Sequence, residues 1–119
     1  MRVFEYGIDV VEVNNRHRAA RKFVRRSKRR VYLQRISDHK DDPRAIRVIG
    51  KSKGWFFHMS ECIGYVPAEI ASKLMDADMQ DKVIARLQSI SIHDKRSIGI
   101  RLDILGTEDD YTKYCSDFS

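Results

Sequence analysis

Cysteine, proline and glycine are scarce in this 119-residue chain, which contains 2 cysteines, 2 prolines and 6 glycines. Cys62 and Cys115 lie far apart in the sequence and no C-x-x-C pair is present, so we expect no disulfide framework. Both thiols are predicted to be free in a reducing compartment, the cytoplasm. No low-complexity linker interrupts the chain, and its length fits one compact domain with one modest core.

Long apolar runs and enzyme fingerprints are also missing. No window approaches the roughly 18 apolar residues of a membrane span or shows the apolar core of a signal peptide. The chain has no Walker loop, no G-x-S-x-G motif and no dinucleotide-binding fingerprint. The sequence therefore predicts a cytoplasmic binding protein that uses no cofactor, has no membrane partner and is not an enzyme.

Acidic residues are absent from residues 16–30, RHRAARKFVRRSKRR, in which nine of the fifteen side chains are Lys or Arg. The whole chain has a net charge of +6, yet the residues outside this segment carry 14 basic and 17 acidic side chains. One concentrated basic patch on a slightly acidic body indicates a polyanionic partner. Nucleic acid is the first candidate, with DNA preferred to RNA; an anionic membrane surface or an acidic protein is the alternative.

A short amphipathic helix is predicted after Asn15, its expected N-cap. Ala19, Ala20, Phe23 and Val24 share one face at helical spacing, and the basic residues project to the other side. None of these basic residues has an acid within four positions with which to form a helix pair. We expect phosphate contacts from the outward-facing cations and from one just beyond them: Arg18, Arg21, Lys22, Arg25, Arg26 and Arg29.

Alternation of apolar and polar residues predicts six short strands, with a bulge near the end of the first, and a second helix that begins at Pro67. The expected fold is mainly β, of the α+β class: a small, partly open six-stranded barrel with two short helices over its openings. Residues 1–106 form the predicted domain, and residues 107–119 form an acidic C-terminal tail. The predicted strands are residues 4–13, 31–36, 45–49, 63–66, 82–92 and 97–105.

Two short patterns carry a family resemblance: D-D-P-R-A-I-R-V at residues 41–48 and I-G-Y-V-P at residues 63–67. They lie between an early strand that ends V-V-E-V and a closing strand G-I-R-L-D-I-L. In this order, over residues 6–106, the chain resembles the HIRAN domain, which occurs in some eukaryotic DNA-repair ATPases and as a stand-alone bacterial or phage protein. The resemblance implies an OB-like or SH3-like barrel that binds DNA, with capture of 3′ ends of single strands in the repair enzymes.

The resemblance also implies site residues, matched position by position. The family's loop Asp falls on Asp42, Tyr65 stands where the relatives have a His, and Arg44 replaces a neutral Asn. The family's Arg–aromatic pair and its Lys fall on residues 14–15 and Ala68, which are Asn-Asn and Ala here. The 3′-end pocket is therefore reproduced only in part, and Asp42, Arg44 and Tyr65 are its candidate members.

Aromatic side chains are the candidates for stacking on bases. In the run Trp55-Phe56-Phe57, the first and third residues share one face of a strand and the second takes the other. Trp55 and Tyr65 are therefore predicted to contact bases, with core packing as the alternative for each.

Together these features predict a non-catalytic module that binds single-stranded or damaged DNA alongside a separate repair ATPase or nuclease. Whether it recognises a 3′ end stays open. The alternative is a protein-interaction or oligomerisation module whose basic face meets an acidic partner, and the oligomeric state stays open. Two further alternatives are metal sites, a nuclease centre or a zinc pair. Their candidate ligands are Asp38, His39, Asp41, Asp42 and Glu61 for the first and His58 and Cys62 for the second.

Overall fold

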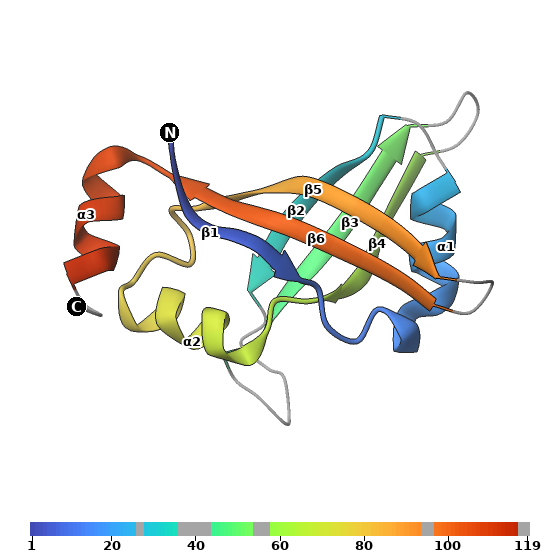
Figure 1. The fold of residues 1–119 in the computed structure, drawn as a ribbon, viewed down its shortest axis with the longest axis horizontal. Coiled ribbons are helices and arrows are strands. Elements are labelled where there is room, and N and C mark those ends of the chain that lie inside the picture. The colour runs from blue at the N-terminus through green and yellow to red at the C-terminus, as the bar shows by residue number, and fades with distance from the viewer. Residues whose placement is uncertain (26–27, 36–43, 54–57, 94–96, 117–119) are drawn as a thin grey trace.

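The computed structural model describes residues 1–25, 28–35, 44–53, 58–93 and 97–116 of the chain. Within these residues, two antiparallel sheets of three strands each and three short helices make a mainly β fold (Figure 1). The predicted fold class, mainly β with a few helices, is confirmed. A hydrophobic core lies between the two sheets.

The first sheet has the strand order β1-β6-β5, so its central strand is the one that comes last in the chain. The alternating residues Ile98, Ile100, Leu102 and Ile104 of β6 are all buried, as their period of two predicts. The pairing of β1 with β6 shifts register twice, between Val3 and Ile8, which places the expected bulge earlier than the strand end. The bounds are β1 Arg2–Asp9, β5 Ile84–His93 and β6 Ser97–Gly106.

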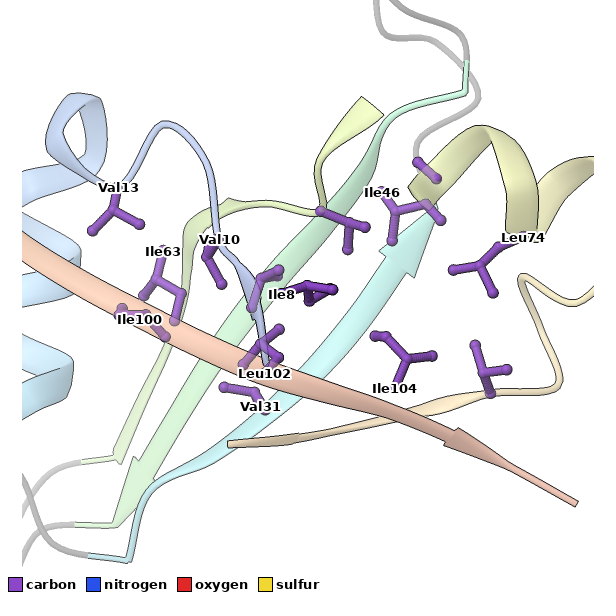
Figure 2. Packing of buried hydrophobic residues seen from close by; sticks show 14 of the residues in the cluster. Ile8, Val10, Val13, Val31, Ile46, Ile63, Leu74, Ile100, Leu102 and Ile104 are labelled. Carbon is purple, nitrogen blue, oxygen red and sulfur yellow. The ribbon is translucent and has the colours of Figure 1, made fainter. Parts of the chain in front are cut away.

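The second sheet has the order β2-β3-β4 and is built from two successive antiparallel pairings. Figure 2 shows side chains from this sheet, among them Ile46 and Ile63, meeting Ile100, Leu102 and Ile104 from the first. All five are buried, so the two sheets share one core. The bounds are β2 Arg30–Arg35, β3 Ile46–Lys53 and β4 His58–Tyr65.

The two sheets meet along one seam through a single backbone bridge between Val11 and Tyr65. The Tyr65 amide donates to the Val11 carbonyl at 2.9 Å, and the Val11 amide donates to the Tyr65 carbonyl at 2.8 Å. Gly64 allows this approach, because a Cβ there would lie 2.6 Å from the Val11 carbonyl oxygen. Along the other seam β2 and β5 form no ladder in the described residues, so the six predicted strands are present but do not close into a barrel.

Three α-helices and one turn of 3-10 helix occur in the described residues. Asn15 lies inside the 3-10 turn and is not the N-cap, because the backbone is already helical at Val13 (φ −59°, ψ −40°). Pro67 is the N-cap of the second helix, which begins at Ala68, one residue later than predicted. The bounds are η1 Asn14–Arg16, α1 His17–Arg25, α2 Ala68–Asp76 and α3 Glu108–Ser116.

Helix α3 occupies most of the segment that the sequence assigned to an acidic tail. Tyr114 is buried and stacks on Phe4 of β1 with ring centroids 5.1 Å apart, and its hydroxyl donates to Glu5 Oε1 at 2.7 Å. Tyr111 also contacts Phe4, with ring centroids 5.7 Å apart. The acids occupy the first turn of α3, where negative charge favours a helix, so this charge is compatible with packed structure.

Candidate functional site

Helix α1 is fixed on the second sheet by two fully buried side chains, Ala20 and Phe23. Phe23 packs directly over Gly50 of β3: a Cβ at Gly50 would lie 2.8 Å from Phe23 Cδ1 and 2.9 Å from Ile63 Cγ2. Ala19 and Val24 are half-buried beside them, so the predicted apolar face of the helix is confirmed. The opposite face of α1 is therefore held outward.

The outward face of α1 carries Arg18, Arg21, Lys22 and Arg25, which are all exposed, as predicted. The sequence predicted an unpaired Lys22, but its Nζ lies 3.4 Å from Glu61 Oε1 on the neighbouring strand β4. Arg18, Arg21 and Arg25 form no ion pair with any residue in the described part of the chain. Arg26 lies outside the described residues.

Arg29 closes the C-terminal end of α1. Its Nη1 donates to the Val24 carbonyl at 2.8 Å, one of the helix carbonyls that lack an intrahelical partner. The side chain is therefore engaged with the helix end, while its residue stays exposed. Arg29 contributes charge beside α1 but is less free to move than the cations of the helix face.

Arg44 lies apart from α1. Its guanidinium donates to Ser72 Oγ at 3.3 Å and pairs with Asp76, both on α2. Helices α1 and α2 lie toward opposite ends of the second sheet (Figure 1). The structure therefore does not bring Arg44 together with the basic helix, and Asp42, its expected neighbour in the site, lies outside the described residues.

Tyr65 is buried, with 8% of its surface exposed, and packs with Ala45 and Cys62. Arg16 Nη2 donates to its hydroxyl at 3.2 Å, and this hydrogen bond raises the pKa of the Arg16 guanidinium. Because so little of the ring is exposed, the structure offers no open face for the expected base stacking. Trp55, the other stacking candidate, lies outside the described residues.

A second basic surface, which the sequence analysis missed, lies where β2, β3 and β4 run together. It is a hollow of about 530 Å³, here called the basic hollow, and none of the described residues that line it is acidic. Strand register brings the lining residues together, because Arg30 is opposite Lys51 on β3, and Lys53 is opposite His58 on β4. Lys51 and Lys53 alternate with Gly50 and Ser52, so they project from the face of β3 that α1 does not cover. The lining residues used below are Lys28, Arg30, Tyr32, Lys51, Lys53 and His58.

The sequence signal for this hollow was weak. Its cations come from two segments, because Lys28 and Arg30 lie at the end of the basic stretch 16–30 and Lys51 and Lys53 lie on β3. Residue spacing gives no sign that these two pairs meet. Tyr32 is 43% exposed in the hollow, and Lys51 Nζ lies 4.6 Å from the centroid of its ring. An exposed aromatic side chain beside four cations is an arrangement that residue periodicity alone does not reveal.

An apolar groove of about 800 Å³ follows the open seam between β2 and β5. Its walls include Leu33 from β2 and Ala85 and Leu87 from β5. Arg30 and Tyr32 line both this groove and the basic hollow, so the two depressions adjoin at β2.

The described residues contain no cluster of three His, Cys, Asp or Glu side chains that could hold a metal ion. His58 and Cys62 both lie on β4, and four residues along a strand correspond to about 13 Å, too far apart to share one zinc ion. Glu61 is paired with Lys22. The other candidate ligands, Asp38, His39, Asp41 and Asp42, fall outside the described residues.

No helix in the part of the chain that the structure describes is long and apolar enough to cross a membrane. Comparisons with protein-family models, with curated proteins and with solved structures found no match for this chain.

Proposed function

We propose that this chain is a non-catalytic nucleic-acid-binding module that holds a phosphate backbone against the outward face of α1. The observation that carries the proposal is the set of exposed guanidinium groups of Arg18, Arg21 and Arg25, which have no ion-pair partner among the described residues. A face that only solvates a helix normally interleaves acids with its bases. Unpaired arginines on an anchored helix are instead suited to bidentate contact with phosphate.

The resemblance to HIRAN domains belongs to this proposal and supports DNA over RNA as the ligand. We relate the strand arrangement to a partly open OB-like or SH3-like barrel with the circular order β5-β6-β1-β4-β3-β2. The backbone bridge from Val11 to Tyr65 supports this view of the β1–β4 seam, and the apolar groove marks the β2–β5 seam. Capture of a 3′ end is not part of the proposal, because Arg44 and Tyr65 are engaged elsewhere.

We place the module in the cytoplasm, in keeping with the free thiols of Cys62 and Cys115. In this proposal the chain has no catalytic group of its own. By binding single-stranded or damaged DNA, it would recruit a separate repair ATPase or nuclease to that DNA.

Charge reversal on α1 tests the proposal. The double variant Arg21→Glu with Arg25→Glu should lose nearly all affinity for fluorescein-labelled oligonucleotides, measured by anisotropy at moderate salt. The matched control is Lys82→Glu with Lys113→Glu, which changes the net charge equally at exposed positions away from α1. If both double variants lose affinity for the oligonucleotide by the same factor, only net charge matters and α1 is not the binding surface. Unchanged binding by the α1 double would contradict the proposal directly.

A protein-interaction module is the second candidate function, and the apolar groove between the free edges of β2 and β5 favours it. An extended segment of an acidic partner could pair with either edge while its charge meets Arg29 and Arg30 at the rim. Multi-angle light scattering across a concentration series tests the self-association form of this candidate. A constant monomer mass would leave only a hetero-partner for the groove.

A further inference from the structure

The basic hollow concentrates positive charge on the face of the second sheet that α1 leaves uncovered. Among the residues that the structure describes, Lys28, Arg30, Lys51 and Lys53 form no ion pair and no acid lines the hollow. Four unpaired cations around one depression raise the local positive potential and favour an anionic occupant. The chemistry of the hollow therefore calls for phosphate or a similar anion.

Anion binding alone does not account for Tyr32. Tyr32 is 43% exposed, so part of this aromatic side chain is open to a ligand. The ring lies where the hollow runs into the apolar groove, so a ligand there meets cations on one side and apolar side chains on the other. A chain of nucleotides has this character, because anionic phosphates alternate with flat, weakly polar bases.

We infer that the strands β2, β3 and β4 present a platform for single-stranded nucleic acid, with a base stacked on Tyr32 and adjacent phosphates held by Arg30 and Lys51. The ligand must be unpaired at this point, because the base faces of a duplex are already stacked on one another. The inference takes only its ligand class, nucleic acid, from the proposed function. The platform itself is a separate surface from α1.

The present position of Lys51 is compatible with this ligand. Its ammonium lies over the exposed Tyr32 ring, 4.6 Å from the centroid. An exposed cation–π contact is weaker than the stacking of a base on an aromatic ring. A base that takes the ring face therefore more than replaces the lost contact, and the displaced ammonium becomes available to a phosphate of the same strand.

Replacement of Tyr32 separates this platform from general charge attraction. Tyr32→Ala should weaken binding of labelled oligothymidylate by about fivefold to 150-fold, the value of one base–aromatic stack, and should change binding of a duplex by less than twofold. Tyr6→Ala is the matched control, because Tyr6 is 74% exposed on β1 of the other sheet. Equal single-strand affinities for the two variants would overturn the inference.

A second measurement avoids the risk that the Tyr32 variant is misfolded. Wild-type protein labelled with ¹⁵N is titrated with a thymidine tetranucleotide, and amide chemical shifts are followed. Shifts at Arg30, Tyr32 and Lys51 support the platform, and shifts confined to α1 overturn it while the proposed function stands. Shifts confined to the platform support it against the role of α1. An absence of shifts at millimolar ligand overturns both.

Discussion

Arg16 and Tyr65 join two distant parts of the chain: Arg16 Nη2, at the start of the helical segment, donates to the Tyr65 hydroxyl at the end of β4 over 3.2 Å. The same tyrosine forms the backbone bridge with Val11. The entry of the chain into α1 is therefore tied to β4 twice, once through a side chain and once through the backbone. Tyr65 therefore has a structural role, which agrees with core packing, the alternative that the sequence left open for it.

Replacing Tyr65 by Phe tests that structural role. The variant keeps the buried ring and loses the hydroxyl that accepts from Arg16, so we expect a loss of about 1 kcal/mol in the free energy of unfolding, measured by urea denaturation. Arg16 is exposed and regains water, which keeps the cost small. Affinity for single-stranded DNA should stay within twofold of wild type. A tenfold loss of affinity in the folded variant would show that the hydroxyl contacts nucleic acid.

Gly50 should tolerate no side chain, because Phe23 and Ile63 already occupy the space of its Cβ. Gly50→Ala is expected to cost about 1–3 kcal/mol of unfolding free energy through overpacking. Gly99→Ala is the control, since the atom nearest its Cβ is the Oγ of exposed Ser91, which can rotate away. We expect a change within about 0.5 kcal/mol there.

A double variant identifies the cause of the Gly50 effect. Phe23→Leu removes the aromatic ring that Gly50 accommodates. The double variant Phe23→Leu with Gly50→Ala should therefore lose less unfolding free energy than the sum of the losses of the two single variants. Strict additivity would mean that the strain at Gly50 arises elsewhere.

Asp103 is a buried carboxylate in β6 with three hydrogen-bond donors. Burial by itself raises its pKa, but hydrogen bonds from Arg86 at 2.8 Å, the Gly7 amide at 2.9 Å and Gln88 at 2.9 Å, with the charge of Arg86, outweigh burial. The net result is a pKa below the ordinary value. Since the folded state favours the ionised form, its contribution to stability is present above about pH 4, the unfolded pKa of Asp, and is lost as pH falls through the folded pKa.

Asp103→Asn should therefore lower the free energy of unfolding by about 1–3 kcal/mol at pH 7, and the gap from wild type should shrink below pH 4. Urea denaturation at several pH values measures both effects. The exposed pair of Asp9 with Arg101, 3.0 Å apart, gives the control Asp9→Asn, with an expected loss of at most about 1 kcal/mol. A gap that widens in acid would contradict the pKa assignment.

Salt dependence tests whether the arginines of α1 meet phosphates. Each neutralised phosphate of a single strand contributes about −0.7 to the slope of log affinity against log salt. Removing two contacts with Arg21→Ala and Arg25→Ala should make the slope shallower by about 1.4 units. The neutral double Lys82→Ala with Lys113→Ala should leave the slope unchanged. Equal slopes for wild type and the α1 double would place the phosphates elsewhere.

The sequence predicted those features that depend on local periodicity. The buried alternation of β6 and the two faces of α1 follow from residue spacing, and both are confirmed at Ile100, Leu102, Ala20 and Phe23. The coarse fold class follows from the same patterns. These features are decided within a few residues, where the period of the backbone relates sequence directly to burial.

Features that depend on distant partners were missed. Lys22 looked unpaired because Glu61 is more than thirty positions away in the sequence, and the pairing of Arg44 with Asp76 spans a similar separation. The acidic charge near the C-terminus obscured the packing of Tyr114 on Phe4, which only the fold brings together. The basic hollow likewise depends on strand register, which apolar alternation does not specify on an exposed face.

The seating of Phe23 on Gly50 gives the positive charge of α1 a fixed orientation, unlike that of a flexible basic tail. A flexible tail must give up backbone freedom when it binds, a cost of about 1–2 kcal/mol for each ordered residue. Helix α1 has already lost that freedom in folding, so its arginines meet a ligand with only their side-chain entropy left to lose. Calorimetric binding should accordingly show a small entropic penalty and a heat-capacity change too small for coupled folding.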